Sequence, residues 1–84
     1  GIAMAESLGD RIRKARLDYG MSQAELARRI GVSKNAMNEI EMNKTLNPGA
    51  LQVKAIATAL RVSTDYLLGL EDDVESEVFA AVAV

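Results

Sequence analysis

A stretch of twenty residues that begins at Ser22 reads as two short helices joined by a tight turn, and it restricts the fold more than any other part of the chain. Ser22 and Glu25 have the S-x-x-E spacing of a capping box, which predicts a helix that starts at Gln23. Gly31 predicts its end, because glycine adopts the left-handed conformation after a last helical turn at little cost. Ser33 is then placed to cap a second helix at once. A turn this short forces the two helix axes to cross steeply.

The two predicted helices have apolar faces that point at each other. Leu26, Ala27 and Ile30 recur at helical spacing in the first helix, and Ala27 is small enough to allow a close crossing. Met37 and Ile40 direct the second helix back at the first. Its opposite side is polar and holds Lys34, Asn35, Asn38 and Glu39. A helix that presents bare polar side chains in this way is suited to the major groove of DNA.

The composition favours one small helical domain. Of the 84 residues 49% are hydrophobic but only three are aromatic, so the core must be aliphatic, as in a helical bundle. The chain has no cysteine, and therefore no disulfide and no thiolate metal site, which fits an intracellular protein. It also has no histidine, the commonest general base and metal ligand. We therefore predict that the chain is not an enzyme and uses no metal or cofactor.

Neither end of the chain predicts a membrane segment. The longest apolar run, residues 78–84, has seven residues, far fewer than the roughly 18–20 that span a bilayer. The beginning lacks the basic and then apolar order of a signal peptide. We expect a cytoplasmic protein that does not interact with a membrane.

Charge is distributed unevenly. Residues 1–70 contain all ten Lys and Arg with seven Asp and Glu, a net charge of +3. Residues 71–84 contain five acids and no base, a net charge of −5. The mildly basic body suits moderate attraction to phosphate, although the whole chain has a net charge of −2.

Helical patterns outside the central pair complete an all-α, five-helix architecture. A first helix is predicted from just after Ser7 to about Tyr19, ended by Gly20. Its inward stripe is predicted to be Leu8, Ile12, Ala15 and Leu17 or Tyr19. Asn47-Pro48-Gly49 predicts a break before a fourth helix. The fourth helix is predicted over about residues 50–60, with Leu51, Ile56, Ala59 and Leu60 as its apolar positions, and the fifth over residues 64–68 between Ser63 and Gly69.

We divide the chain into three parts. Residues 1–7 form an N-terminal extension, of which residues 1–3, ahead of Met4, are set aside as a remnant of expression. Residues 8–70 form the helical domain, and residues 71–84 form an acidic and then apolar tail.

Several short motifs occur in a fixed order along the domain. They are Arg16-Leu17-Asp18-Tyr19-Gly20, Ser22-Gln23-Ala24-Glu25-Leu26-Ala27, Gly31-Val32-Ser33, Ile40-Glu41 and Ala59-Leu60-Arg61-Val62-Ser63-Thr64-Asp65-Tyr66-Leu67-Leu68. In this combination residues 8–70, about three-quarters of the chain, resemble the helix-turn-helix domain of lambdoid phage repressors and Cro, the XRE-type transcriptional regulators. The resemblance implies a compact five-helix, lambda-repressor-like DNA-binding domain of a prokaryote or phage, found at the nucleoid when it is bound to DNA.

The resemblance also implies roles for individual positions. Lys34 and Asn35 stand where the first residues of the recognition helix meet base edges, and Asn38 and Glu39 stand where further groove contacts are made. Phosphate contacts are implied for Ser22, Gln23, Ser33, Asn43 and Lys44. Gln23 would also brace the recognition helix, and Arg16 and Glu41 match a salt bridge between the first and third helices. The family commonly has glycine where this chain has Asn43, and asparagine is the next best residue at positive φ.

The chemistry of the exposed polar residues is compatible with these roles. Lys34 can donate to O6 and N7 of guanine, and an asparagine can pair with N6 and N7 of adenine. Glu39 has two open interpretations, because a carboxylate near phosphates is repelled unless it accepts from N4 of cytosine. It is either a base reader or an ordinary solvated residue.

The tail has a separate interpretation. Its acids lack the glycine turn and ligand spacing of a calcium loop, so we expect a solvated linker. Its large apolar residues are too numerous for an end that stays in water, and they predict a dimer contact, either as a helix or as a strand paired with its copy. The residues assigned to this contact are Leu70, Val74, Val78, Phe79 and Val82. The alternative is a disordered or truncated end.

Two functions are therefore considered. The first is a sequence-specific regulator of transcription, a repressor that binds double-stranded DNA as a homodimer on a near-palindromic operator. The second is an antitoxin or other interaction module whose tail binds a partner protein, with DNA binding secondary. An enzyme is disfavoured, since no paired carboxylates fall in a predicted cleft.

Overall fold

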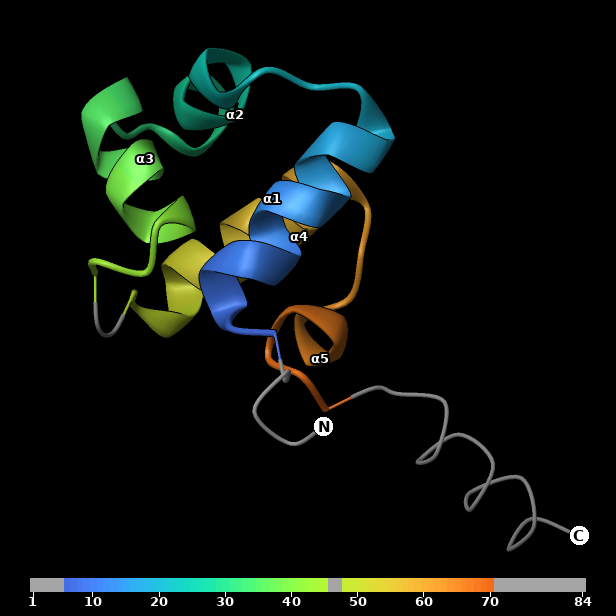
Figure 1. Cartoon of the computed structure of the whole chain (residues 1–84). Coiled ribbons are helices and arrows are strands. Elements are labelled where there is room, and N and C mark those ends of the chain that lie inside the picture. The colour runs from blue at the N-terminus through green and yellow to red at the C-terminus, as the bar shows by residue number, and fades with distance from the viewer. Residues whose placement is uncertain (1–5, 46–47, 71–84) are drawn as a thin grey trace, which may run out of the picture.

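The computed structural model of the chain describes residues 6–45 and 48–70, and within these ranges it contains helices and no strand. Its helices are α1 (Leu8–Tyr19), α2 (Gln23–Ile30), α3 (Lys34–Glu41), α4 (Ala50–Leu60) and α5 (Thr64–Leu67). α1 and α4 lie together in the middle of the domain, with α2 and α3 at one end and α5 at the other (Figure 1). None of these helices is long and apolar enough to span a bilayer. The predicted all-α architecture is confirmed, while the predictions for Asn47, Val74, Val78, Phe79 and Val82 lie outside the described residues.

Serine caps begin four of the helices. The hydroxyls of Ser7, Ser22, Ser33 and Ser63 each accept a hydrogen bond from the backbone amide three residues further on. Each such cap stabilises a helix by about 1 kcal/mol, because it satisfies one of the first amides that have no partner within the helix. The starts of α1, α2, α3 and α5 are therefore set locally.

The capping box predicted at Ser22 forms only in part. The Ser22 hydroxyl accepts from the Glu25 amide at 3.0 Å, but the Glu25 carboxylate accepts from Nη2 of Arg29 at 2.9 Å, one turn further along α2. A guanidinium four residues away offers a charged partner that competes with the backbone of the cap. The reciprocal box forms at the start of α1, between Ser7 and Asp10.

Positive φ angles end the first two helices and the fourth. Gly20 and Gly31 follow α1 and α2 with φ angles of 82° and 77°, as the sequence predicted. Asn43, near the end of α3, has a φ of 62°, so asparagine does replace glycine in this turn. α4 differs, because its left-handed cap is Arg61, with a φ of 59°.

Each helix contributes one completely buried side chain to a shared core. These side chains are Ile12, Leu26, Met37, Ile56 and Leu67. Helices of four to twelve residues are marginal on their own in water, so packing around this core must hold them in place. Ala27, only 2% exposed, allows the close approach of α2 and α3 that the sequence indicated.

Three apolar side chains do not lie where the sequence predicted. Leu17 and Tyr19 were alternatives for the inward stripe of α1, but they are 61% and 43% exposed. Leu51 of α4 is 82% exposed. The predicted Ile12 and Ala15 are buried in α1, together with Arg16. In α4 the predicted Ile56 and Leu60 are buried, together with Val53 and Ala57. The stripe in α1 was misjudged because it includes a charged residue, Arg16.

Candidate nucleic-acid interface

α3 has a buried side and a polar, solvent-facing side. Lys34, Asn35 and Glu39 are exposed, and Asn38 is half-buried. The helix follows its capping residue Ser33, so Lys34 and Asn35 lie in its first turn. The four residues predicted to contact bases therefore belong to one accessible helix.

The beginning of α2 lies next to this polar side. A shallow hollow is lined by Gln23, Lys34, Asn35 and Asn38, so one predicted phosphate contact and three predicted base contacts lie together. In the described part of the chain no group of three or more acidic side chains is placed to bind a metal ion. The chemistry available at this surface is hydrogen bonding from amides and one ammonium group.

A buried ion pair joins α1 to the end of α3. Nε and Nη2 of Arg16 donate to the two carboxylate oxygens of Glu41, at 2.7 and 3.0 Å. The remaining Nη1 donates to the carbonyl of Met21 at 2.9 Å. Two parallel bonds to one carboxylate give the pair a fixed geometry, and this geometry sets where α3 lies relative to α1.

Gln23 connects this ion pair to the polar side of α3. Its Nε2 donates to Oε1 of Glu41 at 3.2 Å and to Oδ1 of Asn38 at 3.3 Å. A carboxylate only accepts, so the amide nitrogen of Gln23 must face Glu41. Both of its N–H groups are thereby used, and the remaining amide oxygen does not bind an anion. The Gln23 side chain is thus a brace for α3, the second of the two roles that the resemblance implies.

Asn38 retains part of its hydrogen-bonding capacity. Its Oδ1 accepts from Gln23, and its Nδ2 donates to Sδ of Met42 at 3.4 Å. A primary amide has two hydrogens and two acceptor sites on its oxygen, so one donor and one acceptor are left. Asn38 is therefore held in a fixed orientation with half of its capacity available.

The side chain of Asn43 stabilises the turn after α3 through hydrogen bonds to the first turn of α1. Its Oδ1 accepts from the Gly9 amide at 2.9 Å, and its Nδ2 donates to Oδ1 of Asp10 at 3.4 Å. The pKa of Asp10 is below its ordinary value, chiefly because the Asp10 carboxylate forms hydrogen bonds with the side chain and then the backbone of Ser7. The hydrogen bond from Asn43 lowers the pKa further. The side chain of Asn43 thus joins the start of α1 to the end of α3.

The backbone of the same turn is also occupied. The amides of Asn43 and Lys44 donate to the carbonyls of Ile40 at 3.1 Å and Glu39 at 2.9 Å. These amides cap the end of α3, and the phosphate contacts implied for Asn43 and Lys44 stay predictions. The exposed ammonium group of Lys44 is the part of this turn that can reach a phosphate.

Gly9 is a residue that the sequence reasoning missed. A Cβ at this position would lie 2.5 Å from the carbonyl oxygen of Ile40 and 2.6 Å from both that of Glu41 and Oδ1 of Asn43. Glycine is therefore required where α1 touches the end of α3. The available signal was a glycine in the first turn of a predicted helix, where it costs helix stability compared with alanine.

We expect Gly9→Ala to destabilise the domain by about 1–3 kcal/mol, the usual cost of overpacking, because the new methyl group meets backbone oxygens that do not move freely. The direction of the change in stability is informative, because in an unobstructed helix alanine stabilises the helix by about 1 kcal/mol relative to glycine. Urea denaturation followed by circular dichroism measures the change. Gly49→Ala is the control, because a Cβ there meets nothing within 4 Å. A Gly9→Ala protein as stable as the parent would show that this contact does not constrain α3.

Comparison with known proteins places this geometry in context. A family model described as helix-turn-helix matches residues 12–67. The HTH-type transcriptional regulator SinR of Bacillus licheniformis is 35% identical over 68 residues, which are 81% of this chain and 61% of that protein. The chain thus spans about three-fifths of the length of this relative.

Two solved structures are similar to the domain. The P22 c2 repressor in complex with a synthetic operator superposes with a TM-score of 0.73 and 34% identity, over 80% of this chain and 100% of that one. SinR, described as the master regulator for biofilm formation, in complex with DNA superposes with a TM-score of 0.67 and 35% identity, over 71% of this chain and 95% of that one. In both cases the similarity extends over almost the whole neighbouring chain.

Proposed function

The chain belongs to the helix-turn-helix family, and from this premise we propose that it is a sequence-specific DNA-binding regulator of transcription that acts as a repressor. The observation that carries the proposal is α3, which is braced on one side by Glu41 and Gln23 and exposes Lys34 and Asn35 on the other. The similar domains of the P22 c2 repressor and SinR are in complexes with DNA, which supports the same partner here. Such a regulator acts in the cytoplasm of a prokaryote, at the nucleoid.

We assign sequence reading to the exposed side of α3. Lys34 is placed to donate to guanine, and Asn35 to pair with adenine. Asn38 contributes the donor and the acceptor that its internal hydrogen bonds leave unused. Glu39 is exposed and forms no ion pair among the described residues, so its proposed base contact is to the N4 donor of cytosine.

We assign the fixed positioning of the protein to phosphate contacts around α3. Lys44 contributes its ammonium group. The first amides of α2 and α3, which follow the caps at Ser22 and Ser33, point away from their helices and attract a phosphate oxygen. Gln23 takes part through its backbone amide, while its side chain remains on Glu41.

We propose a homodimer as the active form. A single head of this size makes too few contacts for the affinity of an operator complex. Two heads related by a two-fold axis place their α3 helices in successive major grooves about 34 Å apart, and occlusion of a promoter then gives repression. Leu70, 54% exposed at the end of the described domain, leads directly into the tail to which we assign the dimer contact. The alternative, a partner protein bound by the tail, depends on residues outside the described ranges.

The salt dependence of operator binding tests the proposal. An operator is first selected from random DNA with the purified protein, which also reveals the half-site and its spacing. The logarithm of the binding constant is expected to fall linearly with the logarithm of salt concentration, by about 0.9 for each phosphate neutralised. Lys44→Ala is expected to reduce the slope by about 1.8 for a dimer, and to weaken all sequences alike.

Lys14→Ala is the matched control, because it removes the same charge from α1, on a face that carries none of the proposed contacts. It is expected to leave the slope nearly unchanged. A slope near zero for the parent protein would contradict phosphate binding altogether. An equal effect of the two lysine variants would show that Lys44 acts only through net charge.

A further inference from the structure

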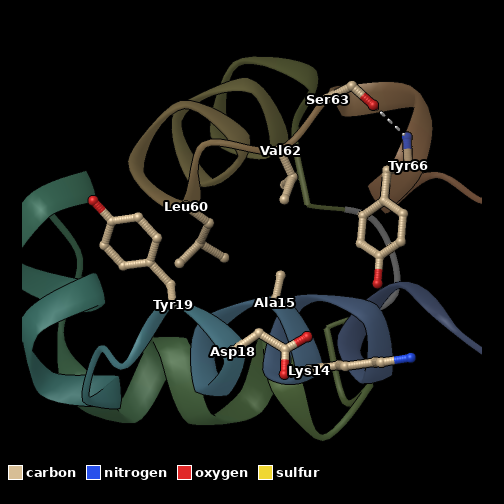
Figure 2. Close-up of a pocket in the computed structure, with 8 residues that line it drawn as sticks. All are labelled: Lys14, Ala15, Asp18, Tyr19, Leu60, Val62, Ser63 and Tyr66. Atoms are coloured by element: carbon tan, nitrogen blue, oxygen red, sulfur yellow. Dashed lines mark hydrogen bonds between the residues drawn. The ribbon is translucent and has the colours of Figure 1, made fainter.

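A second feature of the surface lies on α2 and α4, apart from the polar side of α3. It is a hollow that we call the cationic hollow, lined among others by Tyr19, Arg29, Leu51, Lys54, Thr58 and Arg61. Every charged side chain that lines it is basic. Another hollow lies between α1 and the segment that joins α4 to α5 (Figure 2). It is lined by one basic residue, Lys14, and one acidic residue, Asp18, so their charges cancel. Arg29 is paired with Glu25, so Lys54 and Arg61 carry the charge that favours an acidic occupant of the cationic hollow.

Arg61 indicates that this charge has a use. Its left-handed φ of 59° is one that side chains adopt at a cost, and among the described residues the other left-handed positions are three glycines, Gly20, Gly31 and Gly69, and Asn43. Strain of this kind persists where the side chain contributes something that glycine lacks. Within residues 6–45 and 48–70, neither Arg61 nor Lys54 has an ion-pair partner. Both charged groups are exposed, so they are available to an acidic partner.

The same hollow exposes apolar surface. Leu51 is 82% exposed and Tyr19 is 43% exposed, and both are among its lining residues. An occupant that matches the hollow therefore needs acidic groups next to bulky aliphatic or aromatic ones. Residues 71–84 have this composition, since five acids within 71–77 are followed by seven consecutive apolar residues, 78–84.

We propose that the cationic hollow binds the tail, residues 71–84, of a second copy of the chain. α5, which precedes the tail in the sequence, lies at the end of the domain opposite α2 (Figure 1). The fourteen residues of the tail extend to about 46 Å, enough to cross to a neighbouring domain. A reciprocal exchange of two tails closes a symmetric dimer. The inference rests on the proposed homodimer and specifies how it is held together.

Disulfide exchange tests the contact in the full chain, which has no cysteine of its own. A Thr58→Cys protein is prepared as a mixed disulfide with thionitrobenzoate and is mixed with a Val78→Cys protein. The thiolate of the Val78→Cys protein displaces thionitrobenzoate and forms a disulfide that joins the two chains. We expect thionitrobenzoate to be released from the Thr58→Cys protein at least about tenfold faster than from the matched Asp18→Cys protein, whose thiol lies in the hollow of Figure 2. The reason is that docking of the tail raises the local thiol concentration.

Equal release rates at the two positions would overturn the proposal. So would a double Thr58→Cys, Val78→Cys chain that oxidises only to an intramolecular disulfide, since the occupant would then be the chain's own tail. A third variant separates docking from stability. Arg61→Gly is expected to raise the melting temperature of the dilute protein by about 4 °C and yet to raise the dimer dissociation constant about tenfold.

An unchanged or tighter dimer in the Arg61→Gly protein would assign Arg61 a structural role only and would overturn the docking. Sedimentation equilibrium measures the dissociation constant at two salt concentrations. DNA binding is followed separately on a single half-site, where one head suffices. The Arg61→Gly protein should bind the half-site like its parent. If the parent itself does not bind, the DNA-binding proposal fails while the tail contact remains.

Discussion

Replacing Glu41 with alanine is expected to leave most of the protein unfolded at room temperature. Arg16 and Glu41 have side chains only 11% and 2% exposed, so loss of the carboxylate leaves a guanidinium charge buried with the Met21 carbonyl as its remaining acceptor. Removing one partner of a buried pair costs about 3–5 kcal/mol. A core of this size rarely supplies more than about 3–5 kcal/mol of net stability. The variant therefore loses nearly all of its folding free energy.

Urea denaturation and the melting temperature, both followed by circular dichroism, measure this loss. Glu25→Ala is the control, since the Glu25–Arg29 pair has a similar distance of 2.9 Å but exposed side chains. Exposed pairs contribute about 0–1 kcal/mol, so the control should remain folded. A Glu41→Ala protein as stable as the Glu25→Ala protein would show that the pair does not hold α3 in place.

A double variant distinguishes the buried charge from the loss of packing. Arg16→Met combined with Glu41→Leu removes both charges and keeps apolar groups of similar volume. Such replacements are often neutral or stabilising, so the double variant should recover most of the stability. It also deprives Gln23 of its acceptor, and binding of DNA by this folded variant would report how much the brace contributes.

The features that the sequence predicted well are those determined within a few residues. The serine caps and the glycine ends at Gly20 and Gly31 depend on the backbone next to them, so the boundaries of α1, α2 and α3 follow from short patterns. The all-α architecture follows from the helical spacing of the apolar residues. Local signals also misled where a second local partner competed, as when Glu25 bonded to Arg29, one turn along the same helix, rather than to its own cap.

The features that the sequence did not reveal depend on residues far apart in the chain. Gly9 contacts Asn43 across 34 positions, and nothing in the first turn of α1 announces that neighbour. The orientation of the Gln23 side chain depends on Glu41, which a pattern of helix spacing does not fix. Arg61 occupies a position where the local rules favour glycine. Conflicts of this kind mark the positions where a function or a tertiary contact overrides propensity.

Asn35→Ala is expected to weaken operator binding by about 2–6 kcal/mol, or between about 30-fold and 20,000-fold. A bidentate contact to adenine discriminates by about 1–3 kcal/mol, and each of the two heads of a dimer loses one. The fold should not suffer, because Asn35 is exposed and alanine is the better helix former. Titration of the selected operator with the variant, at one fixed salt concentration, measures the loss.

Asn38→Ala is the matched control, with the same substitution one turn along α3. Its amide already bonds to Gln23 and Met42, so its removal should cost less operator affinity and more stability than that of Asn35. The base that Asn35 reads is identified by changing each base pair of the half-site in turn. At that one pair the Asn35→Ala protein should no longer distinguish the original base, while it keeps its preference elsewhere and its affinity for random DNA. A uniform loss on all sequences would instead place Asn35 on the phosphate backbone, and the reading of sequence would then fall to Lys34 and its neighbours on α3.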